Sequence, residues 1–191
     1  MTVSLDDVLR RVSAHRPNTI ELSHGLQAAT ALIITAEADP RFAIIRRTKH
    51  DGDPWSGHAA LPGGKVDPTD VDAVATARRE AFEEVGVELG EAVGRLDDIG
   101  GRIMKGVVTP VVFHIPEAVP FSPDPREVAG AHWIPLSIIT DASYRIRYPN
   151  RLVGPWPAWN VRTGEPAPLD NLVIWGLTHR ILSAFREVAL D

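Results

Sequence analysis

Glu80, Glu83 and Glu84 are the residues of this sequence whose types and spacing are best suited to chemistry. Positions i, i+3 and i+4 share one face of an α-helix, so a helix here would gather three like charges. Such charges repel one another unless a cation compensates them, and hard oxygen ligands suit Mg²⁺ or Mn²⁺ better than zinc. The alternative interpretation is a solvated acidic helix face, which is common on protein surfaces.

The carboxylates require a helix, and the sequence predicts one from residue 70 to residue 85. Its apolar positions recur at helical spacing, and Gly86 is a suitable C-terminal stop. These positions are Val71, Val74, Ala75, Ala77, Ala81, Phe82 and Val85. Upstream, residues 61–64 (Leu-Pro-Gly-Gly) cannot continue a regular strand, because proline lacks a donor, so we expect a sharp turn there.

The remaining elements favour an α/β or α+β fold, in which strands are flanked by helices. The whole chain, residues 1–191, is expected to form a single domain. Within it we expect an N-terminal helical extension (1–25), a hairpin (29–35 and 42–46), further strands (107–115 and 131–134), an irregular Pro-rich loop (141–168) and a C-terminal helix (171–189). The N-terminal helix is expected to pack outside the catalytic core.

Composition excludes several classes of protein. The formal net charge is -5, which gives no basic footprint for DNA or RNA. There is no cysteine, so disulfides, thiolate nucleophiles and cysteine-bound zinc are excluded. No export signal is evident, and the apolar runs are shorter than the ~20 residues of a membrane helix. We therefore expect a cytoplasmic protein with no nucleic-acid or membrane partner.

The order of residues around the carboxylates is more specific than the carboxylates alone. Pro62-Gly63-Gly64-Lys65 is followed by Arg79-Glu80-Ala81-Phe82-Glu83-Glu84-Val85-Gly86-Val87. This pattern, spanning residues 61–87, resembles the Nudix box, G-x5-E-x7-R-E-U-x-E-E-x-G-U, where U is a bulky aliphatic residue. Ala81 replaces the first U, Asp70 stands where the first Glu is expected, and one extra residue precedes Arg79.

The resemblance implies a fold and an activity. The expected fold is a Nudix-like α/β/α sandwich with a mixed sheet, and the expected reaction is metal-dependent hydrolysis of a diphosphate linkage in a small molecule. Four features are similar to those of the coenzyme A pyrophosphatase-like subgroup. They are the one-residue insertion before Arg79 and the three segments Ile44-Ile45-Arg46-Arg47-Thr48, residues 57–64 and Trp175-Gly176-Leu177-Thr178. Asp53 and Leu61 depart from that subgroup's upstream motif. Coenzyme A or an acyl-coenzyme A is thus the leading substrate.

The resemblance also implies a metal site for Mg²⁺ or Mn²⁺. Glu80 and Glu84 would be the direct ligands, and Glu83 would bind a second ion or hold its water. The carbonyl of Gly63 would supply a backbone ligand, because glycine allows the backbone to approach an ion. Arg79 would pair with a box carboxylate and fix its rotamer.

Other residues are candidates for substrate binding and proton transfer. Arg46, Arg47 and Lys49, with the box residue Gly64, would meet the substrate phosphates; a solvated basic strand end is the alternative for the cations. Glu127 precedes a strand, where some Nudix enzymes place a water-activating carboxylate. A surface acid is the alternative interpretation of Glu127, with Glu83 or metal-acidified water as the base.

Several aromatic and histidine residues have a structural and a functional interpretation. Trp156 and Trp159 would stack on a base or pack against the core, and packing is favoured. Trp175, at apolar spacing on the C-terminal helix, is expected in the core. His50 and His58 flank the entry to the box and would touch phosphate or serve as polar packing.

Other functions remain open from the sequence. The box does not separate coenzyme A from ADP-ribose, a nucleotide sugar, a dinucleoside polyphosphate or a prenyl diphosphate. A binding protein that keeps the fold without catalysis would be expected to have degenerate box glutamates, and all three are present. A homodimer is compatible with the sequence.

Overall fold

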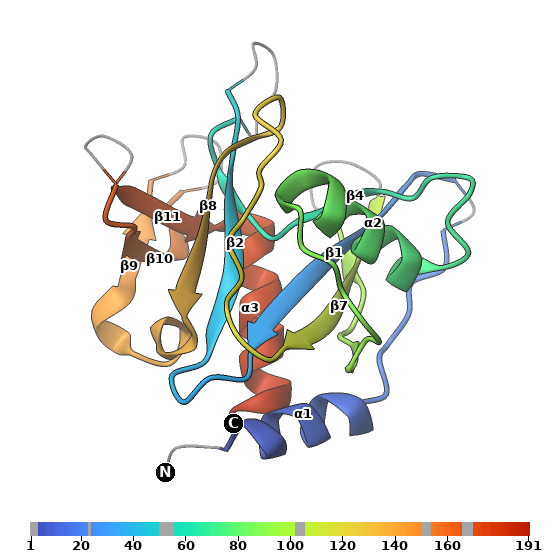
Figure 1. Cartoon of the computed structure of the whole chain (residues 1–191), viewed down its shortest axis with the longest axis horizontal. Coiled ribbons are helices and arrows are strands. Elements are labelled where there is room, and N and C mark those ends of the chain that lie inside the picture. Colours follow the sequence, from blue (N-terminus) through green and yellow to red (C-terminus); the bar gives the residue numbers. More distant parts are fainter. Residues whose placement is uncertain (1–3, 23, 50–55, 102–105, 150–153, 166–169) are drawn as a thin grey trace.

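The computed structural model describes residues 4–22, 24–49, 56–101, 106–149, 154–165 and 170–191 (Figure 1). His50 and Asp53 lie outside these ranges. The main sheet of the described chain has eight strands, with the order β3-β2-β1-β7-β5 and with β4, β6 and β8 paired to β1, β7 and β2. The strands are β1 (Leu26–Thr35), β2 (Arg41–Arg47), β3 (Ala59–Ala60), β4 (Gly63–Lys65), β5 (Gly94–Arg95), β6 (Ile99–Gly100), β7 (Gly106–Ile115) and β8 (Val128–Pro135).

The pairing of β1 makes the sheet mixed. β1 and β2 form the expected antiparallel hairpin, while β1 and β7 run parallel over their whole length, from Leu26 opposite Gly106 to Thr35 opposite Ile115. Parallel neighbours require a crossover connection, and the segment between β1 and β7 contains the box helix. The predicted mixed sheet with flanking helices is confirmed.

The strands alternate between two hydrophobic cores, one on each face of the sheet. Along β1, Leu32 and Ile34 belong to one core and Ala31 and Ile33 to the other, as expected when successive side chains point to opposite faces. Helices α1 (Leu5–Ala14) and α3 (Gly176–Ala189) cover the first core, and α2 (Ala73–Val85) covers the second. The box helix therefore lies on the opposite face of the main sheet from the C-terminal helix.

The box helix begins three residues later than the pattern predicted. Asp72 is its N-cap and accepts a hydrogen bond from the backbone N–H of Ala75 at 2.8 Å. Its end is as expected, because Gly86 adopts the left-handed conformation with φ 70°. The turn before it also differs from expectation: the chain bends at Pro62, but Gly63 and Gly64 then form the short strand β4 on β1.

The C-terminal third of the chain corrects two predictions. Residues 141–168 were expected to be an irregular loop, yet their described part contains the strands β9 (Arg145–Tyr148) and β10 (Trp156–Arg162). Residues 171–175 were expected to be helical, yet they form β11 (Asn171–Trp175), and the helix begins at Gly176. The three strands make a second antiparallel sheet, β11-β10-β9, whose ladder hydrogen bonds order the Pro-rich segment.

The N-terminal helix is part of the core rather than packed outside it. Ser4 caps it by accepting a hydrogen bond from the N–H of Asp7, as the sequence predicts. Val8 and Val12 are buried in the same core as α3. No helix among the described residues combines the length and apolar character that crossing a membrane requires.

Candidate functional site

Arg79 is the centre of the candidate site. Its guanidinium donates to Asp70 through Nε at 3.1 Å and Nη2 at 2.9 Å, which is the two-point geometry that arginine and a carboxylate favour. Nη1 donates to Glu80 and to Glu83, both at 2.9 Å. Nη2 also donates to the carbonyl oxygen of Lys65 at 3.0 Å. One side chain thus links the box helix to β4 and to the loop between them, and the expected pairing of Arg79 with box carboxylates is observed.

Asp70 fixes Arg79 rather than facing open solvent. It also accepts hydrogen bonds from the hydroxyl of Thr76 and the backbone N–H of Asp67, each at 2.9 Å. The Arg79 hydrogen bonds hold the pKa of Asp70 well below its usual range, although burial opposes this. The sequence marked Asp70 as a departure from the box and did not identify it as the partner of Arg79. The polar contacts of Thr76, Asp67 and Arg79 with this one carboxylate come from the fold of the loop, which the pattern does not encode.

Glu84 is the most buried of the three box carboxylates, with 3% of its surface exposed. Its Oε2 accepts a hydrogen bond from the backbone N–H of Gly63 at 2.8 Å. Burial, opposed by this hydrogen bond and reinforced by the nearby charges of Glu80 and Glu127, raises the pKa of Glu84 to about 8. A carboxylate in this position gains strongly from a cation, because a positive charge offsets both the desolvation and the repulsion.

Glu80 lies against the second glycine of the box. A side chain at residue 64 would overlap the Glu80 carboxylate, so glycine at this position leaves room for that carboxylate beside β4. Burial is the main cause that raises the pKa of Glu80, while Arg79 lowers it and Glu83 and Glu127 raise it further. The two glycines of the box therefore contact the two expected metal ligands, Gly63 through its N–H and Gly64 through the space left by its missing side chain.

Glu83 and Glu127 are both exposed. Glu83 contacts Arg79, and Glu127 is near enough to Glu80 and Glu84 to raise the pKa of each. The carbonyl oxygen of Glu127 accepts a hydrogen bond from the N–H of Thr48 at 2.8 Å, which joins the loop before β8 to the end of β2. Glu127 is thus a surface acid, and it lies within electrostatic reach of the box.

The three expected substrate-binding cations lie in different surroundings. Arg47 follows Ala43 and Ile45 at alternate positions of β2, which places it on the face of the sheet that α2 covers, and its charge lowers the pKa of Glu84. Arg46 donates to the carbonyl of Asn171 at 3.1 Å and therefore reaches β11 of the second sheet. Lys49 is exposed and lies beside Gly57. Arg46 and Arg47, which were predicted to act together, therefore lie on opposite faces of the sheet, next to a register shift in the pairing of β2 with β8.

The carboxylates do not form a closed cage. Among the residues that the structure describes, no group of three or more His, Cys, Asp or Glu side chains is placed to hold a metal ion. In this geometry the cation that Glu80 and Glu83 contact is Arg79. The donor set is nevertheless chemically suited to a hard cation, since two desolvated carboxylates lie beside the backbone of Gly63 and Gly64.

Trp175 was expected in the core on the C-terminal helix, but it is half-buried at the end of β11 and is surrounded by other aromatic rings. Its ring is 4.9 Å from the rings of His58 and Tyr148 and 6.2 Å from that of Trp156, all measured between centroids. These rings come from β9, β10, β11 and the segment before β3. Trp159 is buried in the core, as the packing interpretation predicts.

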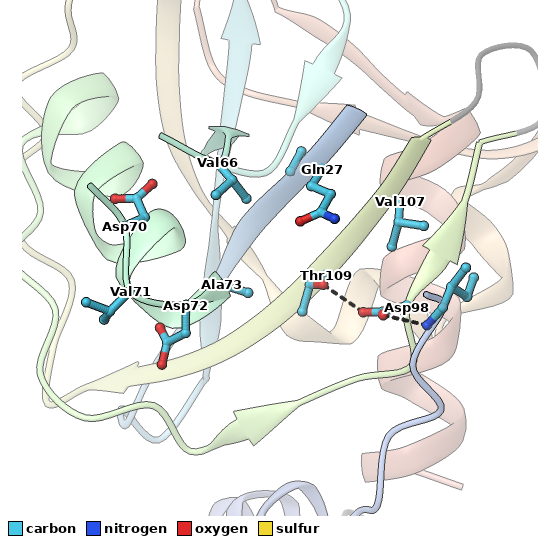
Figure 2. A pocket seen from close by; sticks show the side chains of 11 residues that line it. Gln27, Val66, Asp70, Val71, Asp72, Ala73, Asp98, Val107 and Thr109 are labelled. Carbon is cyan, nitrogen blue, oxygen red and sulfur yellow. Dashed lines mark hydrogen bonds between the residues drawn. The ribbon is translucent and has the colours of Figure 1, made fainter. Parts of the chain in front are cut away.

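A cavity of about 300 Å³ lies at the N-terminal end of the box helix (Figure 2). Asp98 accepts hydrogen bonds from the hydroxyl of Thr109 at 2.7 Å and from the N–H of Ile20 at 2.9 Å. Asp98 and Thr109 are labelled in Figure 2. Asp70 lines the cavity, but none of the three box glutamates does. This cavity is therefore separate from the carboxylate face of the helix.

Comparison with known proteins identifies the family of this fold and site. A NUDIX domain matches residues 25–155, and the chain belongs to the Nudix hydrolase family. It is 32% identical to the uncharacterized Nudix hydrolase NudL of Escherichia coli K12, over all of this chain and 95% of that protein. NudL of Enterobacter sp. 638 is 30% identical over 99% and 95%.

Solved structures agree on the fold. The NUDIX domain of Shewanella oneidensis NrtR, solved with ADP ribose, aligns with a TM-score of 0.53 and 19% identity, covering 62% of this chain and 78% of that one. A MutT/nudix family protein from Enterococcus faecalis aligns with a TM-score of 0.57 and 19% identity, covering 97% and 69%. At this identity the likeness supports the fold alone.

Proposed function

We propose that this chain is a Mg²⁺- or Mn²⁺-dependent Nudix hydrolase that cleaves the diphosphate linkage of coenzyme A or an acyl-coenzyme A. The observation that carries the chemistry is the placement of Glu80 and Glu84. Both are partly or fully buried, both have a raised pKa, and both lie against the glycines of the box. Family membership supports hydrolysis of a diphosphate, and the subgroup likeness of the sequence supports coenzyme A.

Glu80 and Glu84 would hold the ion, with the carbonyl of Gly63 as a backbone ligand and Glu83 at the solvent side. When bound, the ion would polarise the phosphoryl oxygens and acidify a water molecule. Arg79 fixes the rotamers of Glu80 and Glu83 through its Nη1 atom, and Asp70 fixes Arg79. The site is thus held by ion pairs on one side and by the glycine strand on the other.

Arg47 is the cation best placed to meet the substrate phosphates. It lies on the box side of the sheet, and its charge is felt by Glu84. Arg46 has a second role, because its contact with Asn171 joins the main sheet to the second one. Glu127 is the candidate base, since its exposed carboxylate lies near both buried glutamates and water can reach it.

A substrate panel tests the proposal. The ratio kcat/KM is measured with Mg²⁺ for coenzyme A, dephospho-coenzyme A, ADP-ribose and a prenyl diphosphate, because this ratio reports differential transition-state binding. Mass spectrometry should identify 3′,5′-ADP and a 4′-phosphopantetheine product from coenzyme A. A clear preference for ADP-ribose or a prenyl diphosphate would overturn the substrate assignment and leave the hydrolase assignment standing. Failure of every diphosphate with either metal would overturn both.

A further inference from the structure

A second cavity, of about 350 Å³, lies between the second sheet and the C-terminal helix. It is lined by Arg145, Ile146, Arg147, Pro157, Ala158, Trp159, His179, Ser183, Arg186 and Glu187. None of these residues belongs to the box. α3 covers the opposite face of the main sheet from α2, and in Figure 1 β8 and β2 lie between the second sheet and the box helix.

Two of the arginines project from the same face of the second sheet as Trp159. Arg145 pairs directly with Trp159 across the ladder, and Arg147 pairs with Pro157. Cross-strand partners and residues two apart share a face, so both guanidinium groups rise beside the indole. Both arginines are exposed, so their charged ends are accessible to a ligand.

The helix supplies the opposite wall. His179, Ser183, Arg186 and Glu187 follow at spacings of four, three and one residues, which places them on one face of α3. The ring of His179 stacks on Trp159 with centroids 4.0 Å apart and planes at 22°. Burial lowers the pKa of His179 to about 4, so this ring is neutral near pH 7. Trp159 is 2% exposed, so the half-buried His179 ring presents the uncharged part of the lining, between the arginines of β9 and Arg186 of α3.

The charges around this cavity are opposite to those of the whole protein. Three arginines and a single glutamate line it, in a chain whose formal net charge is -5. Arg186 contacts Asp191 through Nε at 3.5 Å, and that aspartate lies outside the lining. The guanidinium groups are donors only, and the hydroxyl of Ser183 adds a further donor. A ligand with several acceptor oxygens and two negative charges meets these requirements, as a phosphomonoester does.

We propose that the cavity between β9, β10 and α3 is an anion-binding site for a phosphomonoester, separate from the diphosphate site of the box. Arg145, Arg147 and Arg186 bind the phosphate oxygens, Ser183 donates a further hydrogen bond, and the organic group rests on the edge of the Trp159 and His179 pair. The volume holds a phosphate together with a small organic group. The site does not depend on the metal ligands, so it remains whatever diphosphate the enzyme cleaves.

Calorimetric titration of the full chain tests this site. Inorganic phosphate and AMP are titrated separately in the presence of EDTA, which removes divalent ions from the box. The double variant Arg145→Gln, Arg147→Gln keeps two polar side chains on an exposed strand and removes two charges. Its matched control is Arg162→Gln on β10 of the same sheet, which removes an exposed charge that does not line the cavity.

We expect AMP to bind saturably to the wild type. The affinity should fall about tenfold or more in the double variant and stay unchanged in Arg162→Gln. Glu84→Gln should bind AMP as the wild type does. The proposal is overturned if neither probe binds, if Arg162→Gln weakens binding as much as the double variant, or if Glu84→Gln changes the affinity in either direction as much as the double variant does, since the last result would place the anion in the box. Binding of AMP but not of inorganic phosphate would retain the site and show that the organic group contributes to affinity.

Discussion

At the scale of single residues, Arg79 holds two of the three box carboxylates, Glu80 and Glu83. It contacts Asp70, Glu80 and Glu83 at once and reaches the carbonyl of Lys65. The sequence predicted that Arg79 would pair with a box carboxylate. It did not predict Asp70 as the anchor, because an aspartate nine residues upstream reaches the guanidinium only through the shape of the intervening loop.

We expect Asp70→Asn to lower kcat about tenfold with little change in KM, because Arg79 loses its charged two-point partner and no longer fixes Glu80. The free energy of unfolding should decrease by about 1–3 kcal/mol, since a hydrogen-bonded ionic contact is removed. Steady-state kinetics and thermal melting measure the two effects. Asp67→Asn, in the same loop but without a hydrogen bond to Arg79, is the control. Loss of stability with kcat unchanged would show that Asp70 only supports the fold.

Glu127→Gln should reduce turnover less than substitution of a buried box glutamate does, because Glu127 is exposed and acts on the site only through its charge and nearby water. The comparison is kcat for Glu127→Gln beside kcat for Glu84→Gln with the same substrate and metal. Equal losses in the two variants would reverse this ranking. Glu127 would then be the leading base or a further metal ligand.

At the scale of elements, the close contact between β4 and α2 sets the geometry of the site. The sequence indicated the break at Pro62 and the helix after it, because proline, glycine and helical periodicity are strong local signals. It did not indicate that Gly63 and Gly64 pair with β1. That pairing depends on Ala29 and Thr30, which lie more than thirty residues upstream.

Gly64→Ala should lower turnover about tenfold or more, because the added methyl group would overlap the Glu80 carboxylate and displace this expected metal ligand. Gly90→Ala is the matched control, since a side chain at that position meets nothing within 4 Å. Turnover and melting temperature are measured for both. Normal turnover in folded Gly64→Ala would mean that Glu80 is free to move without loss of function.

The second sheet shows where local patterns fail. Leu172 and Ile174 are buried, while Asn171 is exposed and Val173 and Trp175 are half-buried, which is the period of a strand. Five residues that lead directly into a helix match a helical pattern as well. The local signal that separates the two elements is Gly176, whose φ of 63° breaks the run. Of the prolines that favoured a loop and that the structure describes, Pro149 follows β9, Pro155 precedes β10 and Pro157 is the second residue of β10, positions near strand ends where a missing donor is tolerated.

The packing of α3 on this sheet predicts a pH dependence of stability. The pKa of His179 is about 4 in the folded protein and close to 6.5 when unfolded, so the unfolded chain binds more protons between these values. Stability is therefore complete above about pH 6.5 and falls as pH decreases toward about 4. The melting temperature of His179→Phe should fall less than that of the wild type as the pH decreases over this range. His114→Phe, at an exposed position, should behave as the wild type, and an unchanged profile in His179→Phe would refute the assignment.

At the scale of the whole molecule, the main sheet separates two sites of opposite charge. The box and its carboxylates are on the face covered by α2, and the arginine-lined cavity is beside α3 on the other. The family motif indicated the first candidate site from the sequence. The second could not be predicted, because Arg145 and Arg147 lie on β9, which the local pattern assigned to a loop, and Arg186 joins them only when α3 packs against that sheet.

The most direct test of the central claim is the turnover of Glu84→Gln and Glu80→Gln with Mg²⁺, measured on the best substrate of the panel beside thermal melting. Glu88→Gln, an exposed position just beyond the helix, is the control. We predict that each box variant loses about a hundredfold or more in kcat while keeping its fold, because a neutral amide preserves the shape of the side chain but removes a metal ligand's charge. Glu88→Gln should be fully active. Full turnover in folded Glu84→Gln or Glu80→Gln would contradict the claim that these carboxylates hold the catalytic ion.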